Sequence, residues 1–145
     1  MSRTTVGRDY TWDAHFNTTR PTASTVIALS ESATAIPSPN TWTVLGGVAG
    51  NEMTADGFAR ALATTVTKNA GAQTGTLFKK FTHTSPAGTG TARTPRIVGV
   101  IAPAVAAAPG AADTGILVFA MPQPNPPTLT GTDSLDQTVS IDLGT

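Results

Sequence analysis

The stretch NEMTADGFARALATTVTK, residues 51–68, decides how the chain folds, because it combines a turn signal with a place for a main strand. Asp56 and Gly57 predict the turn, since Asp tolerates turn geometry and Gly takes a positive φ at no steric cost. The TTVT run at 64–67 is β-branched and stiff at χ1, which suits a pleated surface. The segment that follows the turn is therefore predicted to be a strand.

Two hydrophobic periods compete within this predicted strand. Phe58, Leu62 and Val66 are spaced by four, which suits one face of a helix, but they also share the parity of one strand face. On the strand interpretation Arg60 has the same parity as these three apolar residues. Its side chain is then expected at the edge of the core, with the stem packed and the guanidinium in water or paired.

Composition limits the class of protein. The chain has 145 residues and 14.7 kDa, which predicts one domain that is large enough for a core. Its formal net charge is zero and its charged residues are only 12% of the total, so no basic surface for nucleic acid is expected. There is no cysteine, which excludes disulfides and thiolate metal sites. No apolar run reaches the roughly 18 residues of a membrane span, and residues 1–8 lack the apolar core of a signal peptide.

Further runs, some apolar and some alternating between apolar and polar residues, predict short strands separated by Gly- and Pro-rich turns. These runs lie at 25–29, 41–45, 76–84, 97–102, 116–121 and 137–143. With the central stretch they make about seven strands, which predicts an all-β fold, an antiparallel β-sandwich or barrel. IVGVIA and ILVFAM are apolar on both parities and should be buried on both faces, or on one face against a partner. The last run alternates, so its polar face should look to solvent or to a partner.

The first residues are predicted to form an extended N-terminal arm, 1–22, outside the β domain of residues 23–145. Tyr10 and Trp12 are two residues apart, so an extended segment places them on one side. Such aromatic anchors suit docking on a neighbouring subunit, and covering the domain's own sheet is the alternative. The candidate interface residues are Tyr10, Trp12, Phe16, Trp42, Phe58 and Arg60.

No catalytic, cofactor-binding or metal constellation is predicted, so the chain is not expected to be an enzyme. His15 and His83 each lack a second ligand at metal spacing and are expected on the surface. Asp133 lacks the twelve-residue calcium-loop pattern and is expected to start a turn. Lys79 and Lys80 are consecutive on a predicted strand, so they should point to opposite faces and guard a sheet edge.

The motif EMTADGFAR at 52–60 resembles the signature E-[VL]-[ST]-G-x-[GS]-Y-A-R of a family of short tailed-phage virion structural proteins, tail fibre-like or capsid accessory. Ala55 stands where Gly is usual, and Phe58 where Tyr is usual. The similarity runs from about Ser24 onward. It is carried further by STVIALS at 24–30, GTLFKKFT at 75–82, TPRIVGVIA at 94–102, GILVFA at 115–120 and the closing residues 132–143.

The resemblance implies a non-enzymatic structural component of a tailed-phage virion, assembled in the host cytoplasm, without cofactor, nucleic acid or membrane contact. Within the virion we expect a capsid decoration protein that forms a homo-oligomer and contacts the major capsid protein. A tail fibre or tail-tip subunit is the alternative. A receptor-binding module that displays loops 85–94 and 103–113 is the other function considered, because loops at one end of a sandwich commonly bind ligands.

Overall fold

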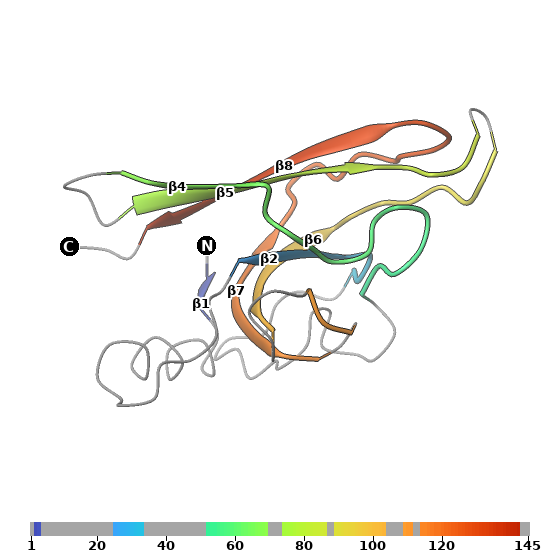
Figure 1. The fold of residues 1–145 in the computed structure, drawn as a ribbon. Helices are drawn as coiled ribbons and strands as arrows, with labels where there is room; N and C mark the ends of the chain where they lie inside the picture. Colours follow the sequence, from blue (N-terminus) through green and yellow to red (C-terminus); the bar gives the residue numbers. More distant parts are fainter. Residues whose placement is uncertain are drawn as a thin grey trace.

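The chain folds into two antiparallel β-sheets that pack as a sandwich (Figure 1). The computed structural model describes residues 2–3, 25–33, 52–69, 74–86, 89–103, 109–111 and 114–142. The described residues include no helix, and hence none that could cross a membrane. The predicted all-β fold is confirmed, in its sandwich form.

One sheet has the strand order β1-β7-β6-β2-β3, and the other has the order β4-β5-β8. The strands are β1 (Ser2–Arg3), β2 (Val26–Ser30), β3 (Ala61–Leu62), β4 (Thr65–Lys68), β5 (Thr74–Thr82), β6 (Ile97–Ala102), β7 (Ile116–Pro122) and β8 (Ser134–Asp142). All neighbouring pairs are antiparallel. Of the predicted arm, the two residues of β1 pair with β7 at the edge of the five-stranded sheet, and the rest lies outside the described residues.

The five-stranded sheet is buried on both faces at its centre. Every residue of β2 and β6 is buried. For β6 this burial was predicted, because its sequence is apolar on both parities. Alternate β6 residues enter different clusters: Val98 and Val100 face the core between the sheets, whereas Ile97 and Ile101 belong to a cluster on the opposite face.

Strand β7 carries a β-bulge that the period-two pattern could not show. Val100 pairs with Phe119, but the next β6 residue, Ile101, pairs with Leu117. Val118 is therefore the extra residue, and both Val118 and Phe119 enter the core between the sheets. A bulge of this kind re-aims side chains without ending the strand.

The three-stranded sheet buries only its inner face. In β5 and β8 the buried side chains have odd numbers, Leu77 and Phe81 on β5 and Val139 on β8. Even-numbered residues of β8 such as Thr138 and Ser140 are exposed. The predicted alternation of the last strand is confirmed, and it starts three residues earlier than the sequence run indicated.

The single main strand predicted after the Asp56-Gly57 turn is wrong. The chain instead contributes β3 to one sheet and β4 to the other (Figure 1). The crossover is abrupt: the N–H of Ala63 donates to the Thr25 carbonyl at 2.8 Å, and the N–H of Thr64 donates to the Phe78 carbonyl at 2.8 Å. Beyond the crossover Val66 is 59% exposed, so it does not join Phe58 in the core as its parity suggested.

The two consecutive lysines lie on β5, the middle strand of its sheet. They do point to opposite faces: Lys79 is half-buried on the inner side and Lys80 is exposed, opposite Asp136 of β8. The expectation that they guard a sheet edge is wrong, because β5 has a neighbour on both sides.

Candidate functional site

The EMTADGFAR motif at 52–60 forms one compact unit between the two sheets. Its start is attached to β2, since Glu52 forms a bridge with Ser30 and the Met53 N–H donates to the Leu29 carbonyl at 2.8 Å. Met53 and Phe58 both enter the core, with 4% and 0% exposure. The two large apolar side chains of the motif therefore serve packing.

The middle of the motif is a tight turn, as the sequence predicted. Asp56 and Gly57 both have positive φ, 58° and 87°, and the Phe58 N–H donates to the Ala55 carbonyl at 3.1 Å. Two positive φ values identify a type I′ turn. A Cβ at Gly57 would lie 2.0 Å from the Thr82 carbonyl oxygen, so only glycine lets the turn pack against the end of β5.

The two ends of the motif, Glu52 and Arg60, form a buried ion pair. Arg60 Nε donates to Glu52 Oε1 and Nη2 donates to Oε2, both at 2.5 Å. The Glu52 side chain is 0% exposed and the Arg60 side chain is 3% exposed. The third guanidinium nitrogen, Nη1, donates to the Thr114 carbonyl at 2.9 Å. Of the two states expected for the Arg60 guanidinium, in water or paired, the structure shows the paired one, and this bidentate geometry is the strong form of the interaction.

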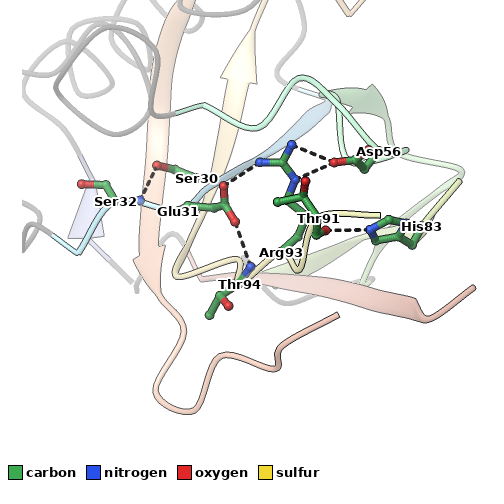
Figure 2. Close-up of polar contacts among 8 residues, drawn as sticks. All are labelled: Ser30, Glu31, Ser32, Asp56, His83, Thr91, Arg93 and Thr94. Atoms are coloured by element: carbon green, nitrogen blue, oxygen red, sulfur yellow. Dashed lines mark hydrogen bonds and ion pairs between the residues drawn. The ribbon is translucent and has the colours of Figure 1, made fainter. Parts of the chain in front are cut away.

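A second arginine, Arg93, lies between two carboxylates (Figure 2). Its Nε and Nη2 both lie 2.7 Å from Asp56 Oδ2, and its Nη1 donates to Glu31 Oε2 at 3.1 Å. The other Glu31 oxygen accepts the Thr94 N–H at 2.9 Å. The hydrogen bond to Asp56 raises the pKa of Arg93 above its ordinary value, so this guanidinium stays charged. The turn of the motif is thus joined to β2 and to the segment before β6.

His83 is buried, with 2% exposure, so its expected place on the surface is wrong. Its Nδ1 accepts the Ser85 N–H at 3.2 Å, which leaves Nε2 to donate to the Thr91 carbonyl at 3.1 Å (Figure 2). The ring is therefore the neutral Nε2–H tautomer. It stands edge-on to Phe58, with ring centroids 5.6 Å apart and an interplanar angle of 78°.

Asp133 lies in a turn, as expected, and closes it. Its Oδ2 accepts the Thr130 N–H at 2.8 Å, and its own N–H donates to the Thr130 carbonyl at 3.0 Å. Within the part of the chain that the structure describes, no group of three or more His, Asp or Glu side chains could hold a metal ion.

The candidate interface residues have separate outcomes. Phe58 and Arg60 are 0% and 6% exposed, so the prediction that they face a partner is wrong. The physical reason is local: the turn directs Phe58 into the core, and Glu52 compensates the charge of Arg60 inside the protein. Tyr10, Trp12, Phe16 and Trp42 lie outside the described residues.

The polar groups of the buried Glu52–Arg60 pair and of the Arg93 cluster bond to partners within the chain. Their guanidinium groups, like the ring nitrogens of His83, are directed at acceptors and donors of the same chain. Such groups fix the relative positions of segments that are far apart in sequence. No protein-family model and no curated protein sequence matches the chain.

Proposed function

We propose that the chain is a non-enzymatic structural component of a tailed-bacteriophage virion, and specifically a capsid decoration protein that stabilises the head as a homo-oligomer. The observation that carries the proposal is the Glu52–Arg60 pair, because the charged ends of the virion-like motif bind each other inside the fold. The pairing supports a structural role for the motif, and the resemblance to virion proteins suggests where the chain acts.

The outer face of the three-stranded sheet is suited to contact with other proteins. Its three-stranded sheet presents an outer face of exposed Thr, Ser, Lys and Asp side chains on β5 and β8. Weak contacts through such faces, repeated over many copies on a shell, add up to strong attachment through multivalency. The major capsid protein is the proposed partner.

A tail fibre or tail-tip subunit is the alternative place in the same particle, and the motif resemblance supports it as well. The receptor-binding alternative has less support. Loop 85–94 precedes β6 (Ile97–Ala102) and loop 103–113 follows it. Residues 94 and 103 adjoin β6 at opposite ends, and this arrangement gives no support to a joint binding surface at one end of the sandwich.

The test is to locate the chain on the particle. Gold-labelled antibody raised against the purified chain is applied to phage particles produced from the genome that encodes it, and the particles are imaged. Label over the head is the expected result. Label confined to the tail would replace the capsid assignment with the tail alternative, and unlabelled particles that also lack the chain by mass spectrometry would overturn the virion proposal. Particles assembled without the gene provide the control for antibody specificity.

A further inference from the structure

Strand β8 (Ser134–Asp142) is a long edge strand. It has nine residues and, within the described ranges, pairs only with β5. The ladder with β5 is regular along its whole length, from Thr82↔Ser134 to Thr74↔Asp142. An edge of this length is a template for pairing with another strand.

The direction of the β8 backbone groups follows from one hydrogen bond next to the strand. The His83 N–H donates to the Asp133 carbonyl at 2.8 Å, in the register that continues as Phe81↔Leu135. In an antiparallel ladder both backbone groups of a residue point to the same side and alternate along the strand. Odd-numbered residues therefore bond to β5, and even-numbered residues direct their N–H and C=O groups away from it.

The two edges of this sheet differ in protection. The other edge, β4 (Thr65–Lys68), is short, and Lys68 shares the strand face of Val66, which lies opposite the core residue Leu77. An inward-facing lysine on a short strand is a device that discourages pairing with another chain. Strand β8 contains no Lys, no Pro and no bulge.

We propose that two copies of this chain associate through β8, antiparallel across a two-fold axis centred on Thr138. Each three-stranded sheet would then continue into its copy to form one six-stranded sheet. The inference deepens the proposed function, which includes a homo-oligomer, and it is tested on the purified chain without virions. Failure of the pairing and failure of the virion assignment are therefore distinguishable.

The centred register gives the Asp136 carboxylate a hydroxyl partner. With Thr138 opposite itself, Asp136 faces Ser140 of the copy at two symmetric positions, and cross-strand hydrogen-bonding pairs stabilise a sheet. A shift of the copy by two residues in either direction breaks these pairs and leaves fewer residues of β8 opposite the copy.

The inner face of β8 fits the same register. Leu135 and Ile141 are half-buried and pack against the core from the edge of the sheet. In the dimer Leu135 lies opposite Ile141 of the copy on this face. The pairing thus extends an apolar row as well as a hydrogen-bond ladder, and apolar cross-strand pairs are a stabilising unit of sheets.

The first experiment is cross-linking by Thr138→Cys, because the wild-type chain has no cysteine. Directly opposed, hydrogen-bonded residues have Cα atoms about 5.5 Å apart, which lies within the range that a disulfide spans. Mild oxidation should convert most of the Thr138→Cys protein to a covalent dimer. The matched control is Ser140→Cys, an exposed position on the same face, which should stay largely uncrosslinked because it faces Asp136.

The second experiment is Thr138→Lys, which sets two like charges opposite each other and should weaken the dimer at least about five-fold in analytical ultracentrifugation. The control Thr65→Lys adds the same charge to the same outer face at the β4 edge, and should leave the dimer unchanged. A wild-type chain that stays monomeric up to high micromolar concentration overturns the proposal. Equal cross-linking by Ser140→Cys, or dissociation by Thr65→Lys alone, also overturns it, the latter in favour of the β4 edge.

Discussion

The two sheets use opposite ways of treating their outer faces. In the five-stranded sheet, Val26, Ala28, Ile97 and Ile101 make an apolar cluster on the side away from the three-stranded sheet. In the three-stranded sheet the corresponding side is polar and exposed along β8. One sheet is thus interior on both sides, and the other is a boundary with water. The difference means that the cost of a substitution depends on which sheet carries it.

The largest effect is expected when a charge enters the doubly buried sheet. Ala28 is 0% exposed, so Ala28→Asp would bury a carboxylate that has no partner. We expect a loss above about 4 kcal/mol, a large part of the stability of an ordinary domain, and therefore little folded protein. Urea unfolding followed by circular dichroism measures the loss.

The matched control for Ala28→Asp is Thr65→Asp, on the exposed face of the other sheet. It should keep a cooperative transition close to that of the wild-type chain. The comparison between the sheets would fail if Ala28→Asp also unfolded within about 1 kcal/mol of wild type.

The next largest effect is expected at the buried Glu52–Arg60 ion pair of the EMTADGFAR motif. Glu52→Gln would leave the guanidinium of Arg60 buried without its counter-charge, which typically costs about 3–5 kcal/mol. The double variant Glu52→Gln/Arg60→Met should recover part of that loss, because no buried charge remains. A double-mutant cycle in urea measures the coupling. Additive losses would show that the two side chains act independently, contrary to their bidentate contact.

A smaller effect is expected at Arg93, because its side chain is 23% exposed. Arg93→Met should cost about 1 kcal/mol, since water and salt screen an ion pair at the surface. In about 1 M sodium chloride the difference from wild type should shrink, whereas the difference caused by Glu52→Gln should persist. A salt-independent cost at Arg93 would contradict the contrast between the exposed and the buried pair.

The smallest effect is expected at Val66, the exposed apolar residue of β4. Val66→Thr keeps the β-branched shape and should change the free energy of unfolding by no more than about 0.5 kcal/mol. Its cross-strand neighbour Leu77 is 4% exposed, and Leu77→Ala should cost about 2–5 kcal/mol. Similar losses for the two variants would show that Val66 is covered in solution.

Local patterns in the sequence predicted two kinds of strand: those buried on both faces and those buried on one face. The continuous apolar run of β6 and the alternation of β8 each require only neighbouring residues, and both predictions are confirmed. The Asp56-Gly57 turn was also predictable, because its geometry depends on two adjacent residue types.

The remaining features depend on partners that are distant in sequence. Two carbonyls on different sides of the sandwich fix the break between β3 and β4. The Thr25 carbonyl, next to β2, accepts the N–H of Ala63, and the Phe78 carbonyl of β5 accepts the N–H of Thr64. His83 is buried because Phe58 and the Thr91 carbonyl lie against its ring. No local pattern contains these contacts. The spacing of Glu52 and Arg60 is a signal that could have predicted their pairing, given that a turn brings the two ends of the motif together.

The strand pairing has a consequence for how the chain is synthesised. Thr74 of β5 pairs with Asp142 of β8, and Val26 of β2 pairs with Ile101 of β6. Contacts between residues so distant along the chain form slowly, because a long loop must close first. Neither ladder can be complete until its late strand has left the ribosome, and β8 is the last of the described strands to emerge. Nascent chains that still lack β8 therefore expose β5 with one neighbour missing, and unpaired strand edges of this kind favour aggregation.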